Sequence, residues 1–207
     1  GTAWEVHFGD PIRSPSAVYD GGKLHKFDAA IAFPPFGLRY DIDVIQQDWF
    51  GRFPELTASG SVLGLRHLLS QAIRSVVVAM PNSILFSTGA ELVMRTSLLN
   101  HGILKAVIGM PAGLLSGTTI PFAVLVLDPA GGHQRVRFVN ADTSRFREPT
   151  SKARAKLINA EELKALVLGE TDTEEAKTVP IHELLINDAQ LQVTRYVRPD
   201  SQIQIET

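Results

Sequence analysis

The sequence predicts an α/β fold built on a mostly parallel β-sheet with helices on both faces. Two observations support this prediction. Short apolar segments of strand length alternate along the chain with segments whose apolar residues recur at helical spacing. The strand-like segments are also apolar almost throughout, as expected for parallel strands that are covered on both sides.

The first part of the chain predicts two strands and a long connection. Residues 4–8 alternate between apolar and polar side chains and are expected to form a strand that ends in the turn Gly9-Asp10-Pro11. Residues 29–33 are uniformly apolar and have the length of a buried strand. Residues 37–60 show no sustained periodicity, and a connection of this length is expected to be functional or mobile.

The central part predicts helices and strands in alternation. Apolar residues at helical spacing predict a helix over residues 62–73, and a β-branched run predicts a strand over 75–80. Residues 89–99 are expected to form a helix, because Asn100-His101-Gly102 can cap its carboxyl end. Residues 103–110 form the next expected strand.

Two further strands are expected at residues 122–127 and 136–139. Because only a short turn separates them, we expect them to pair antiparallel as a hairpin at one edge of the sheet. The sequence therefore predicts a mostly parallel sheet with one antiparallel edge hairpin.

The character of the chain changes beyond residue 143. A basic and polar stretch is followed by a short helix at 160–168, an acidic linker at 170–177 and a small element at 181–186. We therefore divide the chain into a main domain, residues 1–143, and a small carboxyl-terminal appendage, residues 144–207.

Composition sets further limits. The 207 residues are 44% hydrophobic and 20% charged, which allows a sizeable core. A formal charge of −2 gives no overall basic footprint, so contact with nucleic acid needs a local patch or a partner. The absence of cysteine suits a cytoplasmic protein, the six histidines are scattered so that no metal is expected, and no apolar run reaches the ~18 residues of a membrane span. The chain begins Gly1-Thr2-Ala3 without methionine, so we expect a segment of a longer protein.

The stretch Phe27–Gly37 is the most informative in the sequence. Its apolar run ends in Pro34-Pro35, which lie between Phe33 and Phe36. Proline has no N–H to donate and a fixed φ, so the strand must stop there and leave a rigid exposed corner. A corner at the carboxyl end of a strand is where α/β proteins usually bind ligands.

This stretch resembles the FD-x-x-x-A-N-P-P-F-G signature of N6-adenine DNA methyltransferases, especially the modification (M) subunit of type I restriction-modification systems. Residues 78–99, 106–127 and 184–197 are similar to successive later parts of the same family, so the resemblance covers nearly the whole chain. It implies part of a Rossmann-like class I S-adenosylmethionine-dependent methyltransferase fold, with residues 1–143 as the carboxyl-terminal portion of the catalytic domain.

The resemblance also implies roles for the corner. In the family, the target adenine is flipped out of the duplex. The Asn side chain and the following proline carbonyl accept its amine hydrogens, and the aromatic after the prolines stacks on the base. Here the carbonyl belongs to Pro34, Pro35 follows it, and Phe36 is the stacking platform. Phe33 stands at the Asn position and cannot accept a hydrogen bond, and loss of one such group costs ~10²–10³ in rate.

S-adenosyl-L-methionine is the cofactor that the resemblance implies. Asp10 matches the place where the family's acid meets the cofactor adenine, although a plain turn is the alternative. No segment before residue 10 can supply the family's glycine-rich loop, so we expect this chain alone to bind the cofactor weakly or not at all. Residues 126–132 resemble such a loop, with Asp142 as a ribose ligand, which would make the enzyme circularly permuted. Since His133 and Gln134 stand where that loop needs small residues, a hairpin turn is the favoured interpretation.

A local basic cluster lies in the carboxyl-terminal part of the chain. It is either a solvated face or a contact with the DNA backbone. Its members are Arg145, Arg147, Lys152, Arg154 and Lys156. The family implies DNA, a specificity subunit and possibly a restriction subunit as partners, with no membrane and no metal.

Two functions therefore remain open. The first is that the longer protein is an S-adenosylmethionine-dependent DNA adenine-N6 methyltransferase of a restriction-modification system. The second is a non-catalytic relative that binds DNA or assembles the complex. Phe33 favours the second, and the order of the four similar stretches favours the first.

Overall fold

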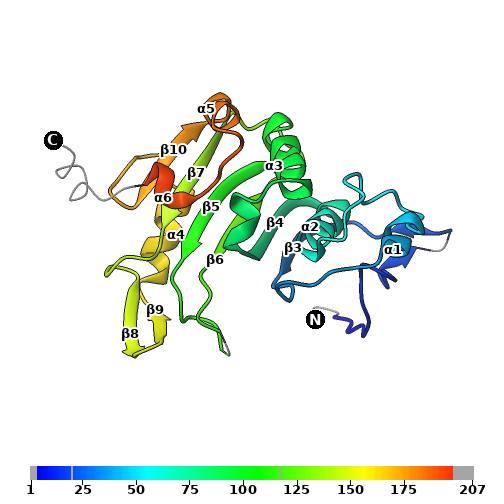
Figure 1. The fold of residues 1–207 in the computed structure, drawn as a ribbon, viewed down its shortest axis with the longest axis horizontal. Helices are drawn as coiled ribbons and strands as arrows, with labels where there is room; N and C mark the ends of the chain where they lie inside the picture. The colour runs from blue at the N-terminus through cyan, green and yellow to red at the C-terminus, as the bar shows by residue number, and fades with distance from the viewer. Residues whose placement is uncertain (1–3, 20, 117, 198–207) are drawn as a thin grey trace.

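A six-stranded sheet forms the centre of the computed structural model, which describes residues 4–19, 21–116 and 118–197 (Figure 1). Residues 198–207 of the expected appendage lie outside this description. The strand order across the sheet is β10-β7-β5-β6-β4-β3. The strands are β3 (Phe27–Ala32), β4 (Ala72–Pro81), β5 (Leu104–Met110), β6 (Phe122–Leu127), β7 (Arg135–Asn140) and β10 (Ala176–Pro180).

The sheet is mixed, so the expectation of a mostly parallel sheet was wrong. β3 pairs with β4 and β5 pairs with β7 in parallel, but β6 runs antiparallel between β4 and β5, and β10 runs antiparallel to β7. The predicted hairpin of residues 122–127 with 136–139 does not form, because β5 lies between these two strands. The connection over residues 128–134 instead crosses the end of β5. β6 is hydrogen-bonded to β4 on one side and to β5 on the other, so no edge of β6 is left for β7.

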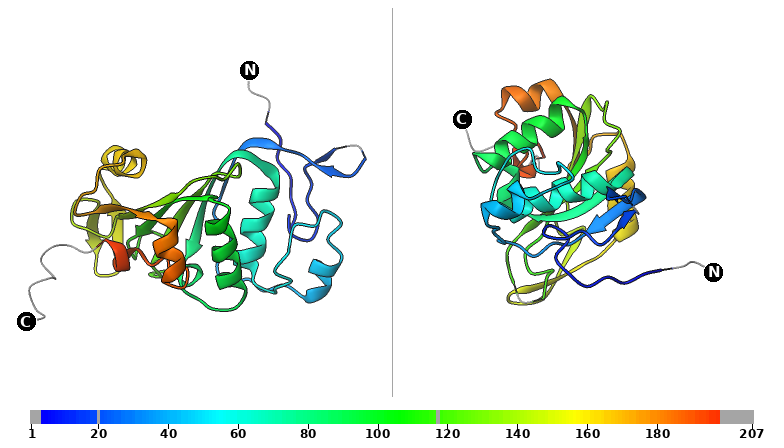
Figure 2. Two further views of the ribbon diagram at one scale, coloured as in Figure 1. Left: turned by 90° about the horizontal axis from the view of Figure 1, so that it is seen from above. Right: turned by 90° about the vertical axis from the view of Figure 1, so that its right-hand side faces the viewer.

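Successive side chains of each strand point to opposite faces of the sheet and pack into two separate hydrophobic cores. Val107 and Phe138 point to a face that is covered by α2 (Gly60–Gln71), α3 (Ala90–Asn100), α5 (Ile181–Ile186) and α6 (Val193–Tyr196). Ile108 and Val139 point to the opposite face, where α4 (Ala160–Leu168) packs. Figure 2 shows α2, α3 and α5 on one side of the sheet and helix α4 on the other. Helices do not cover both faces at β3, however, since Ile31 is 84% exposed.

Several local predictions were confirmed and others were wrong. β6, α4 and α5 have the predicted bounds, and the remaining central strands and helices differ by at most a few residues. The expectation of a strand at residues 4–8 was wrong: this segment has no regular secondary structure and pairs with no strand in the described part of the chain, and Trp4 and Phe8 are 82% and 96% exposed. β10 occupies part of the segment that was expected to be an acidic linker.

Short elements that the sequence pattern did not predict complete the fold. They are the hairpin of β1 (Val18–Tyr19) and β2 (Lys23–Leu24), helix α1 (Ile42–Gln46), the 3-10 helix η1 (Asn82–Leu85), and the hairpin of β8 (Arg147–Ser151) and β9 (Arg154–Leu157). The division at residue 143 stays a prediction. The segment after it contributes β10, α5 and α6 to the main sheet and its core.

Candidate functional site

The corner after β3 is held against the start of α2. Gly37 has φ +77, a left-handed conformation that glycine adopts without strain, and it lets the chain turn back after the prolines. The Gly60 N–H then donates to the Leu38 carbonyl at 2.9 Å. A side chain at position 60 would collide with Leu38, because an added Cβ would lie 2.7 Å from the Leu38 carbonyl oxygen. Glycine at the start of α2 therefore allows the corner to approach the helix closely.

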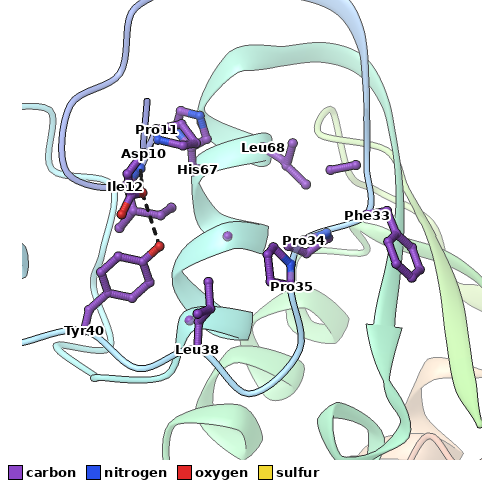
Figure 3. A pocket seen from close by; sticks show the side chains of 13 residues that line it. Asp10, Pro11, Ile12, Phe33, Pro34, Pro35, Leu38, Tyr40, His67 and Leu68 are labelled. Atoms are coloured by element: carbon purple, nitrogen blue, oxygen red, sulfur yellow. Dashed lines mark hydrogen bonds between the residues drawn. The ribbon is translucent and has the colours of Figure 1, made fainter. Parts of the chain in front are cut away.

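A cavity of about 220 Å³ lies between this corner, α2 and the loop at residues 10–12 (Figure 3). Its walls are mainly apolar and include Pro34, Pro35 and Leu68. Asp10, Tyr40 and His67 bring polar side-chain groups to the lining. The structure thus brings Asp10 and the corner residues, which lie more than twenty positions apart in the sequence, to the same cavity.

Asp10 is fixed by several neighbours. Its Oδ1 accepts hydrogen bonds from the Ile12 N–H at 2.9 Å and from the Tyr40 hydroxyl at 3.2 Å. The Arg13 Nε lies 3.5 Å from its other oxygen, Oδ2. Burial, followed by the charge of Asp10, raises the pKa of Tyr40, so this phenol stays protonated and continues to donate. A carboxylate held in this way is preorganised as an acceptor at the cavity wall.

Arg52 fastens the loop at residues 10–12 to the body of the protein. Its buried guanidinium donates from Nη1 to the Pro11 carbonyl at 2.9 Å and from Nη2 to the Ile12 carbonyl at 2.8 Å. Asp48 pairs with its Nε at 2.8 Å, which compensates the buried charge. Sequence reasoning missed Arg52, because it lies in the aperiodic segment between residues 37 and 60.

His67 is also a functional candidate that the sequence did not reveal. It lies on α2, is 8% exposed, and its Nδ1 is 2.9 Å from Nη1 of Arg52. Burial, followed by the charge of Arg52, lowers the pKa of His67 to about 4. The imidazole is therefore neutral near pH 7. The only available signal was a polar residue on the apolar face of a predicted helix.

An aromatic cluster lies on the other side of the corner. The ring of Phe33 is 5.4 Å from that of Phe36, and Phe122 meets Phe33 edge-on at 6.1 Å. In Figure 3 the Phe33 ring lies on the far side of Pro34 and Pro35 from Asp10. Phe33 is 55% exposed, whereas Phe122 is buried at the start of β6. The corner therefore separates the polar side of the cavity from an aromatic surface.

The predicted basic cluster divides into paired and unpaired cations. Arg145 pairs with Glu162 and Glu175, and Arg147 pairs with Asp142. The remaining three cations belong to the β8–β9 hairpin, where Arg154 donates to the Leu115 carbonyl at 2.6 Å. Lys152 and Lys156 form no ion pair within the described part of the chain. The hairpin lies at the β7 side of the sheet and not beside β3 (Figure 1).

The loop at residues 128–134 is not built like a cofactor loop. The N–H groups of Gly131, Gly132 and His133 already donate to the carbonyls of residues 128, 101 and 102. Moreover, this loop precedes β7 and Asp142 follows it, so six strand residues, about 20 Å, separate them. These contacts argue against the circularly permuted arrangement.

The described residues contain neither a candidate membrane span nor a candidate metal cluster. No helix among them is long and apolar enough to cross a bilayer. The same residues contain no group of three or more His, Asp or Glu side chains arranged to hold a metal ion.

Comparison with known proteins places the chain. The sequence profile of the family described as N-6 DNA Methylase matches residues 2–204. The chain belongs to this family. It is 24% identical over 215 residues to the Type I restriction enzyme MjaVII methylase subunit of Methanocaldococcus jannaschii, covering 95% of this chain and 36% of that protein.

Solved structures of type I methylase subunits share the fold of this chain. The methyltransferase subunit of the type I restriction-modification system from Streptococcus thermophilus matches with a TM-score of 0.78 and 22% identity, over 91% of this chain and 41% of that one. A modification subunit of a putative type I restriction enzyme from Vibrio vulnificus matches with a TM-score of 0.65 and 20% identity, over 77% of this chain and 34% of that one. The chain thus spans about two fifths or less of these relatives.

Proposed function

We propose that this chain is the carboxyl-terminal part of the catalytic domain of an S-adenosylmethionine-dependent DNA adenine-N6 methyltransferase, the M subunit of a type I restriction-modification system. Membership of the N-6 DNA methylase family and the partial coverage of longer relatives support the proposal. The observation that carries it is the corner after β3. A cavity with a fixed carboxylate lies on one side of it, and an aromatic surface lies on the other.

The cavity suits the adenine moiety of the cofactor. Its volume of about 220 Å³ lies below the ~300–1,000 Å³ of sites for whole drug-sized ligands, so it fits one ring system rather than the complete cofactor. Proline and leucine side chains pack on the flat faces of a purine, and Asp10 accepts from its exocyclic amine. The rest of the cofactor would be held by segments outside this chain.

The target base belongs on the aromatic side of the corner. Phe36 would stack on a flipped adenine, a contact of roughly 1–3 kcal/mol, and the Pro34 carbonyl would accept from its amine. When bound, S-adenosylmethionine would supply an electrophilic methyl group for N6, with S-adenosylhomocysteine as the leaving group and the amine proton released to solvent. Phe33 provides no acceptor at the Asn position, so this chain lowers the barrier less than its relatives with Asn.

A non-catalytic methyltransferase-like subunit is the second candidate. The observation that favours it is Phe33, whose ring packs on Phe36 and occupies the side of the corner where the base would stack. Such a subunit would bind DNA or assemble the complex without transferring methyl groups.

Methyl transfer by the full-length protein tests the proposal. We expect weak incorporation of labelled methyl groups into DNA by the natural sequence and an increase of ~10²–10³ in Phe33→Asn. Phe33→Ala is the matched control, since it removes the ring without adding an acceptor. Failure of all three proteins to methylate DNA, while they still bind it, would instead support the non-catalytic subunit.

DNA, a specificity subunit and possibly a restriction subunit are the proposed partners, because the relatives are described as subunits of type I restriction enzymes. The DNA contact proposed here is the β8–β9 hairpin, whose Lys152 and Lys156 form no ion pair with any residue that the structure describes. Replacing both with glutamine should remove about two phosphate contacts. The slope of the logarithm of the DNA-binding constant against the logarithm of the salt concentration should then become shallower by about 2. Arg145→Gln is the control, because its charge is already paired with Glu162 and Glu175.

A further inference from the structure

His67 lines the cavity beside the corner, and only one of its two ring nitrogens has a protein partner among the described residues. Nδ1 of His67 faces Nη1 of Arg52 at 2.9 Å. The other ring nitrogen, Nε2, forms no hydrogen bond to any described residue, although the imidazole is 8% exposed and lines the cavity. Nε2 is not among the fully buried side-chain atoms that lack a hydrogen bond, so it is reachable from the cavity, and a ligand there can replace water as its partner.

The neighbours of His67 determine which nitrogen carries the hydrogen. A guanidinium group offers only hydrogen-bond donors, so Nδ1 must be the acceptor of the Arg52 contact. Asp48 and the carbonyls of Pro11 and Ile12 hold Arg52 in this position. In a neutral imidazole the hydrogen then belongs to Nε2. His67 therefore presents a fixed N–H donor, and its low pKa agrees with the neutral form.

We propose that His67 is a positioning residue that donates from Nε2 to a ring nitrogen of the cofactor adenine, with Arg52 selecting the tautomer. This inference rests on the function proposed above and identifies the groups that distinguish adenine at that site. Asp10 and His67 line the same cavity, one as an acceptor and one as a donor. Adenine presents the complementary pair, an exocyclic amine beside a ring nitrogen, on both its N1 and its N7 edge.

The Asp10 acceptor and the His67 donor together also predict which purines the cavity rejects. On either edge, a 6-oxo purine such as hypoxanthine would place a carbonyl oxygen against the Asp10 carboxylate. On the N1 edge its N1 hydrogen would also face the His67 donor. Unmatched polar contacts in a largely apolar cavity are more costly than the loss of one hydrogen bond.

A purely structural role of His67, as a support for Arg52, makes the opposite predictions for two substitutions. In His67→Asn the side-chain oxygen can replace Nδ1 and support Arg52, but no group reaches the position of Nε2. In His67→Gln the amide nitrogen can reach that position, but the support of Arg52 is lost. We expect S-adenosylhomocysteine to bind the full-length His67→Asn protein ~10-fold more weakly than the natural protein, and His67→Gln to stay within ~3-fold. The reverse order would overturn the proposal.

Ligand analogues test the same contact from the other side. Removing the accepting ring nitrogen, in the 1-deaza or the 7-deaza analogue of S-adenosylhomocysteine, should weaken binding to the natural protein ~10-fold for one of the two. That analogue and the parent ligand should bind His67→Asn equally. Equal binding of all three ligands to the natural protein would refute the role of His67 while the proposed function stands. Absence of any binding of S-adenosylhomocysteine to the natural protein would refute both. Calorimetry provides the affinities, and far-UV circular dichroism confirms that each variant is folded.

Discussion

Lowering the pH from 7 to 5 is expected to remove about 2 kcal/mol of folding stability through His67 alone. The pKa of His67 is about 4 in the folded protein, against an ordinary value of 6.5. The unfolded chain therefore binds a proton as the pH falls through 6.5, while the folded protein resists protonation until about pH 4. The stability that the neutral His67 contributes is complete above pH 6.5 and is lost as the pH falls from 6.5 to 4. The total loss is about 3 kcal/mol, at 1.36 kcal/mol per pKa unit.

The structural cause is burial against a fixed cation. His67 lies on α2 against the guanidinium of Arg52, so a proton on Nδ1 would place two positive groups 2.9 Å apart in a buried environment. The carboxylates of Asp48 and Asp10 oppose this effect and raise the pKa, but burial and Arg52 dominate.

Urea unfolding at pH 7, 6 and 5 measures this contribution. Other groups that titrate in this range affect the natural protein and His67→Asn alike, so the difference between the two isolates His67. We expect His67→Asn to be less stable at pH 7 and the gap to narrow by about 2 kcal/mol at pH 5. If the difference in unfolding free energy between the two proteins stays constant from pH 7 to 5, with equal m-values, the folded protein does not lower the pKa of His67, and the reasoning is refuted.

Two further predictions concern the packing that holds the sheet. Gly102→Ala should destabilise the protein by more than about 2 kcal/mol, because its Cβ would collide with the His133 carbonyl oxygen. Gly132→Ala, whose Cβ would meet no described residue within 4 Å, should cost only about 1 kcal/mol of backbone strain. Arg95→Met should lower the midpoint of urea unfolding by the equivalent of about 3 kcal/mol, since this buried guanidinium serves three backbone carbonyls; a loss below 1 kcal/mol would contradict that role.

Local elements could be predicted from the sequence because their signals are local. The apolar run of β6 and the helical periodicity of α4 fall within one window each, and both elements have the predicted bounds. Strand pairing is a non-local property. β6 and β7 are neighbours in the sequence, and no pattern within them shows that β5 lies between. β10 was hidden because it is an edge strand in which only Ala176 and Val179 are buried.

The candidate site divides in the same way. The double proline marks the corner in the sequence, and the turn at Asp10 marks the other wall of the cavity, although the roles of both stay predictions. Arg52 and His67 could not be found, because their contact with each other forms only in the folded protein and fifteen positions separate them. Phe122 reaches the corner only because β6 inserts beside β4, with Phe122 opposite Pro81. These residues depend on tertiary pairing and not on local pattern.

The packing of Phe33 determines what the Phe33→Asn experiment measures. Its ring contacts both Phe36 and Phe122, so it shields part of the surface on which a base would stack. Asparagine at this position would do two things at once: it would add an acceptor and uncover Phe36. Alanine does only the second. A gain shared by Phe33→Asn and Phe33→Ala would therefore identify steric shielding as the defect, whereas a gain confined to asparagine would identify the missing hydrogen bond.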